Sequence, residues 1–202
     1  MRDLVVIGGS LAGLRRLCGL IDQLPSTFQA PILAVVHASP DRSASPVKLL
    51  GACTSLPVTY GAEGANPVAG RVYLAPGNQD LIVRSPGVLG LAAAGRSGPS
   101  TSPSASDRLF ESAARACGPR VIGVLLAGGD VEGLDGLRAI NAAGGIGVFE
   151  AAEDAEEAVH ARTRSRAGGG GRHFPEAQYC LPLDDIAELL RQLVDGVDVT
   201  PA

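Results

Sequence analysis

The chain has 202 residues, of which 46% are hydrophobic and only 3% aromatic, and its formal net charge is −4. This composition is enough for one sizeable core of small aliphatic side chains and excludes a disordered chain, while the acidic balance offers no general attraction for nucleic acid. No apolar run approaches the roughly 20 residues of a membrane span and no signal-peptide pattern opens the chain, so we expect a cytoplasmic protein without membrane insertion.

The first half of the chain alternates short apolar segments with helical patterns. Residues 11–24 have apolar side chains at helical spacing, and this pattern ends before Pro25. Residues 81–83 and 88–91 are expected to pair as a hairpin. The other strands expected from apolar runs are, in chain order, 4–7, 31–36, 57–60 and 71–74.

The second half continues the alternation after a stretch rich in Gly, Ser and Pro at 95–106, which predicts a flexible connection. We expect Asp107 to open a helix that runs to residue 116 and stops at Gly118 and Pro119. Strands are then expected at 121–126 and 147–149, and helices at 134–143 and 183–194.

This order of elements predicts the α/β class. Strands that alternate with helices form a doubly wound, mostly parallel sheet with helices on both faces, a Rossmann-like three-layer sandwich. We expect a single domain over residues 1–195, followed by a C-terminal tail at 196–202.

The four cysteines lie far apart in the sequence. Their spacing matches neither a metal site nor the disulfide framework of a small secreted protein. We therefore expect reduced thiols, most of them in apolar surroundings, as is usual inside cells. The residues are Cys18, Cys53, Cys117 and Cys180.

A glycine-rich turn, VVIGGSLAGL, opens the chain at residues 5–14. A dinucleotide-binding fingerprint would need glycine where Ser10 stands, and a phosphate-binding P-loop would need lysine where Leu14 stands. The nucleophile elbow G-x-S-x-G fits until its last glycine, which is Ala12. The motif alone therefore leaves the role of the turn open.

Polar residues follow three of the expected buried strands. Ser10 follows the first, His37 the second, and the acidic pair Asp130 and Glu132 follows the strand at 121–126. If these strands are neighbours, a nucleophile, a base and an acid that orients the base converge at one edge of the sheet. Each residue also has a structural interpretation, because Ser10 or Asp130 could cap a helix and a histidine can be a satisfied structural residue.

The same segments resemble the catalytic domain of the chemotaxis protein-glutamate methylesterases (the CheB family). That family has I-G-A-S-T-G-G after its first strand, a histidine at the end of the next, and a turn of the form L-T-G-M-G-x-D-G. Matching segments occur in the expected order over nearly the whole chain, among them LPSTFQAPILAVVHASP, GRVYLAPGNQDLIV, SDRLFESAARACGPRVIGVLLAGG, GLRAINAAGG and LPLDDIAELL.

The resemblance implies that Ser10 attacks a glutamate γ-methyl ester while His37 takes its proton, with deamidation of glutamine as a second reaction. Counting back from GLRAI places Glu132 at the family's aspartate, and Asp130 is the alternative orienter. The backbone N–H groups that would hold the oxyanion belong to Leu11, Gly128 and Gly129. No cofactor or metal is implied.

The implied substrate is a methyl-accepting receptor or a related signalling protein. The family's receiver domain has no counterpart in these 202 residues, so control by a separate receiver-domain partner is expected. Because Leu11 and Ala12 replace a threonine and a glycine of the family pattern, a catalytically degenerate binding module of a chemosensory pathway is the alternative function. A nucleotide-binding domain is the third possible function.

Overall fold

A computed structural model describes residues 2–9, 13–36, 45–77, 79–94, 103–127, 132–151, 177–197 and 199. Within these residues, a seven-stranded sheet has the order β3-β4-β2-β1-β7-β8-β9, and every neighbouring pair is parallel. Its strands are β1 (Leu4–Gly9), β2 (Ile32–Val36), β3 (Val58–Tyr60), β4 (Val72–Leu74), β7 (Val121–Leu125), β8 (Ile146–Glu150) and β9 (Tyr179–Leu181). A separate antiparallel hairpin consists of β5 (Gln79–Ser85) and β6 (Val88–Ala93).

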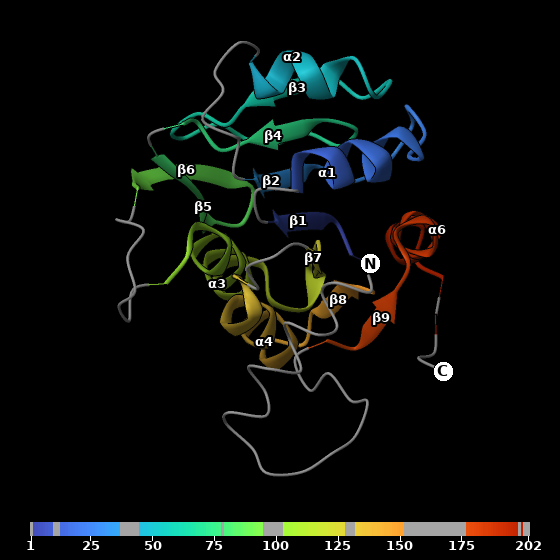
Figure 1. The fold of residues 1–202 in the computed structure, drawn as a ribbon. Coiled ribbons are helices and arrows are strands. Elements are labelled where there is room, and N and C mark those ends of the chain that lie inside the picture. Colours follow the sequence, from blue (N-terminus) through green and yellow to red (C-terminus); the bar gives the residue numbers. More distant parts are fainter. Residues whose placement is uncertain are drawn as a thin grey trace.

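Helices cover both faces of this sheet, which confirms the predicted three-layer α/β fold (Figure 1). One face packs against α1 (Gly13–Asp22), α2 (Pro46–Gly51) and α6 (Leu183–Val194). The other packs against α3 (Ala105–Cys117), α4 (Leu134–Ala142) and the hairpin. None of the helices in these described ranges is long and apolar enough to span a membrane.

The apolar strand sequences bury side chains on both faces. In β1, Val5 and Ile7 join the core beneath α1 and α6, whereas Leu4 and Val6 join the core beneath α3 and α4. Successive side chains of a strand point to opposite faces, so a parallel strand covered on both sides needs an unbroken apolar run. The segment LVVI supplies one.

The structure corrects several element boundaries. The helix expected at 107–116 begins at Ala105, because Ser104 is its N-cap and Asp107 completes a capping box with it. Two short elements, α2 and β9, were not expected, and β8 extends to Glu150. The hydroxyl of Tyr179 donates to the carbonyl oxygen of Val199 at 2.7 Å, so the predicted C-terminal tail contacts the domain.

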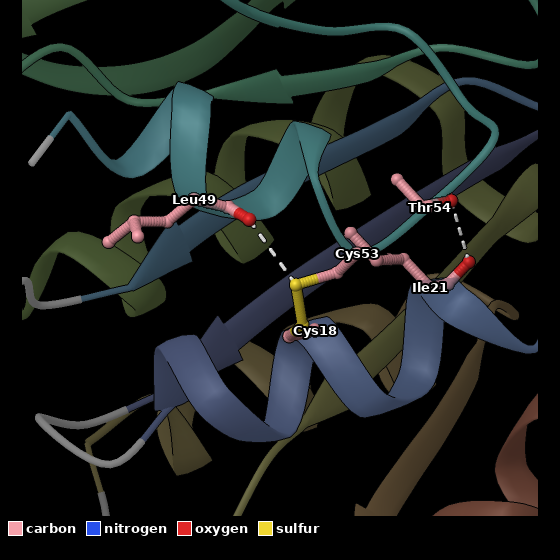
Figure 2. The surroundings of a disulfide bond; sticks show 5 residues. All are labelled: Cys18, Ile21, Leu49, Cys53 and Thr54. Carbon is pink, nitrogen blue, oxygen red and sulfur yellow. Dashed lines mark hydrogen bonds between the residues drawn. A yellow bond between two sulfur atoms is a disulfide. The ribbon is translucent and has the colours of Figure 1, made fainter.

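The expectation of four reduced cysteines is wrong for two of them. Cys18 on α1 and Cys53, just after α2, form a disulfide (Figure 2). Thr54 adds a second link, because its hydroxyl donates to the carbonyl oxygen of Ile21 at 2.9 Å. The expectation holds for Cys117, which is free and buried, and burial raises the pKa of its thiol. Cys180 is half-buried.

Reducing this disulfide is expected to lower the free energy of unfolding by about 2 to 4 kcal/mol, because the bond closes a loop of more than thirty residues in the unfolded chain. The loss is partly offset, since the freed Cys53 thiol can donate to the carbonyl oxygen of Leu49, which lies 3.2 Å from its sulfur. Urea unfolding with and without a dithiol reductant measures the change. Cys18→Ser should reproduce it and then show no response to reductant; equal stability of the oxidised and reduced protein would contradict it.

Candidate active site

The direction of the chain connections reverses between β1 and β7, which makes the carboxyl edge of the sheet there a topological switch point. These strands are parallel neighbours. However, β1 continues into α1 on one face, whereas β7 continues into α4 on the opposite face. The connections that follow β1 and β7 therefore lead to helices on opposite faces of the sheet. Parallel α/β sheets bind their ligands at such a point.

The three strands that precede the candidate residues end side by side. Gly9 pairs with Val36, and Gly8 pairs with Leu125. The ladder continues past β7, because the N–H of Leu126 donates to the carbonyl oxygen of Gly8 at 2.8 Å. The first condition for a convergent site, that these strands be neighbours at one edge, is therefore met.

The candidate residues themselves lie almost entirely outside the described residues. This applies to the nucleophile and base candidates, to one of the two acids and to the three backbone donors: Ser10, His37, Asp130, Leu11, Gly128 and Gly129. Glu132 is described. It is half-buried and stands directly before Gly133, the residue at the N-terminal boundary of α4.

The first glycine of the opening turn has a packing reason. A Cβ on Gly8 would lie 2.8 Å from both Cβ and Oγ of Ser106 and 3.1 Å from the ring of Phe110. Helix α3 thus approaches β1 so closely at this point that only glycine fits. Because the close packing of α3 explains why residue 8 is glycine, this glycine is not evidence of a phosphate-binding loop.

The segment that follows Glu132 is held to α3. Gly133 has a φ of 106° and packs so closely that an added Cβ would lie 3.0 Å from atoms of Leu125 and Ser106. The Oδ1 of Asp107 accepts a hydrogen bond from the N–H of Gly136 at 2.8 Å. These contacts set where α4 begins, and with it the position of Glu132 near the carboxyl edge.

A buried carboxylate that the sequence analysis did not single out lies at the same edge. Glu150, the last residue of β8, is 2% exposed. Its Oε1 pairs with Nη1 of Arg16 at 2.5 Å, and its Oε2 accepts from the N–H of Ala127 at 2.8 Å. The one signal in the sequence is a single acidic residue at the end of the apolar segment IGVFE, and this signal does not reveal which residues pair with it.

The fold and the strand-end geometry define a doubly wound α/β protein with a topological switch point between β1 and β7. The chain belongs to the CheB methylesterase family, which it matches over residues 5–190. In the solved structure of the Thermotoga maritima CheB methylesterase catalytic domain, 99% of the chain superposes on 96% of this one, with a TM-score of 0.76 and 27% identity.

Similar curated sequences are named protein-glutamate methylesterase/protein-glutamine glutaminase. The relative numbered 2 from Anaeromyxobacter dehalogenans is 36% identical over 95% of this chain but only 53% of its own length. A relative from Leptospira interrogans, named as putative, is 28% identical over 95% of this chain and 94% of its own. The chain thus spans about half the length of relatives such as the first and nearly all of the second.

Proposed function

We propose that this protein is a protein-glutamate methylesterase. It would hydrolyse glutamate γ-methyl esters on a chemoreceptor-type signalling protein and also deamidate glutamine side chains. Family membership supports the reaction class, and the relatives' names supply protein glutamate and glutamine side chains as the reacting groups, while the chemoreceptor is what the family resemblance implies. The single observation that carries the assignment of residues is the alignment of the ends of β1, β2 and β7. Ser10 and His37 directly follow β1 and β2, and the acidic pair lies in the connection between β7 and α4.

In the proposed reaction, Ser10 attacks the ester carbonyl while His37 accepts its proton. Glu132 or Asp130 orients His37 and stabilises its charged form. Methanol leaves with the proton that His37 returns to it, and water then hydrolyses the acyl-enzyme by the same proton transfers. The backbone N–H groups of Leu11, Gly128 and Gly129 would hold the oxyanion from the two sides of the topological switch point.

Two features of the fold support this arrangement. Ser10 and Leu11 belong to the connection between β1 and α1, and Gly128 and Gly129 to the connection between β7 and α4. The nucleophile Ser10 and the backbone donors Gly128 and Gly129 therefore come from opposite sides of the topological switch point. We include a cytoplasmic location in the proposal, as the family resemblance implies.

The direct test uses a receptor cytoplasmic fragment that carries isotopically labelled methyl esters. Volatile labelled methanol should accumulate with the protein and not without it. Mass spectrometry of the same fragment should show glutamine residues converted to glutamate. The proposed function would be contradicted if receptor fragments of several sequence classes showed no methanol release and no deamidation.

A further inference from the structure

We propose that Glu150 is a positioning residue that fixes helix α1 relative to the turn after β7. This inference rests on the proposed function, because its consequence is the relative placement of Ser10 and the backbone donors Gly128 and Gly129. The observation that carries it is the pair of contacts made by one buried carboxylate, to Arg16 on α1 and to Ala127 after β7.

The alternation of β8 side chains directs Glu150 to this place. Ile146 and Val148 belong to the core beneath α1 and α6, whereas Phe149 belongs to the opposite core. Glu150 therefore points to the face that α1 covers, two residues beyond Val148 at the carboxyl edge. The backbone is fixed there, because β8 pairs with β7 on one side and with Leu181 of β9 on the other.

The two oxygens of Glu150 serve different elements. Oε1 contacts the guanidinium of Arg16, whose side chain is 30% exposed, while Oε2 accepts the backbone N–H of Ala127. A carboxylate this buried is tolerated only with a charge partner and hydrogen-bond donors, and here both are supplied. Moving either α1 or the turn would remove one of them, so the carboxylate resists a change in their separation.

The contacts lie next to the proposed catalytic groups on both sides. Ala127 directly precedes Gly128, and Arg16 lies in the first turn of α1, which begins three residues after Ser10. Reacting groups that shift by about 1 Å can lose about 10²-fold in rate. A tie between α1 and the turn therefore acts on the distance between the nucleophile and the oxyanion donors, without touching the substrate.

Three variants test the link that Glu150 forms between α1 and the residue after β7. Glu150→Gln keeps the shape and one acceptor oxygen but loses the charge that pairs with Arg16. Arg16→Met removes the guanidinium from the other end. The double variant Glu150→Gln/Arg16→Met completes a double-mutant cycle, which isolates the coupling between the two residues.

A matched control exists at the opposite edge of the sheet. Arg120, just before β7, pairs with Asp3, just before β1, at 2.9 Å. This ion pair joins the same two strands far from their carboxyl ends. Arg120→Met therefore removes an ion pair between β1 and β7 that lies away from the candidate site, and it should leave kcat unchanged.

We expect Glu150→Gln and Arg16→Met each to lower kcat for methanol release by at least about tenfold, with KM changed less than about twofold. The double variant should be no slower than the slower single variant, because the two residues act as one unit. The rate of fluorophosphonate labelling of Ser10 should fall in parallel. Thermal midpoints measured for every variant show how much of the loss in kcat comes from lower stability.

The proposal is overturned if kcat and labelling rate stay at the wild-type level in Glu150→Gln or Arg16→Met. It is equally overturned if they fall only as far as in Arg120→Met at the same loss of thermal midpoint. A wild-type protein that neither releases methanol nor labels at Ser10 refutes the proposed function itself and the inference with it. An active wild type with unaffected variants refutes the inference alone.

Discussion

Replacing Ser10 with alanine is expected to abolish methanol release while leaving the fold intact. The Ser10 hydroxyl is the only group of the protein that forms a covalent bond to the substrate in the proposed mechanism. Loss of the nucleophile in a serine hydrolase lowers kcat by on the order of 10⁶. The same methylated receptor fragment measures the loss, and circular dichroism with thermal unfolding checks that the structure is kept.

The control for this change is Ser55→Ala, which removes an exposed hydroxyl at a serine outside the candidate site. Methanol release should be the same as in the wild type. If Ser10→Ala releases methanol at the wild-type rate, Ser10 is not the nucleophile, and the turn after β1 has only a structural role.

The second large effect concerns the acid that orients His37. Glu132→Gln and Asp130→Asn, made separately, should differ sharply. Loss of the true orienter leaves the histidine in the wrong tautomer, at a cost on the order of 10⁴ in kcat in the serine-protease mechanism. Loss of the other acid removes only a charge near the proposed site, and a change in kcat below about tenfold is expected.

The control here is Asp135→Asn, since Asp135 is an exposed acid on α4 that pairs with Arg138. It should retain full activity. If both site variants also retain full activity, neither acid orients His37 and the Ser/His/acid mechanism is wrong. Loss of activity in both variants to the same extent would mean that the two carboxylates work together.

Much of the fold follows directly from the sequence because its strands are apolar runs and its long helices are amphipathic. The helix expected at 183–194 has those bounds in the structure, since its apolar spacing extends over three turns. The segments PVKLLG and YCL, which form α2 and β9, are too short to show a period. Their structure depends on packing against elements that lie far away in the sequence.

The candidate site is only partly accessible to sequence reasoning. The positions of Ser10 and His37 could be proposed because each directly follows an apolar strand, and those strands are neighbours. The role of Glu150 could not be proposed from the sequence, because its partners Arg16 and Ala127 are distant in sequence and only the fold brings them together. The disulfide between Cys18 and Cys53 escaped prediction for the same reason.

The measurement that tests the central claim most directly is labelling with a fluorophosphonate probe, followed by peptide mapping with mass spectrometry. The proposed mechanism predicts one modified serine, Ser10, and a labelling rate that falls when His37 is replaced by alanine. Modification of a different serine, or no modification of a folded protein, would contradict the claim that the turn after β1 presents a reactive nucleophile.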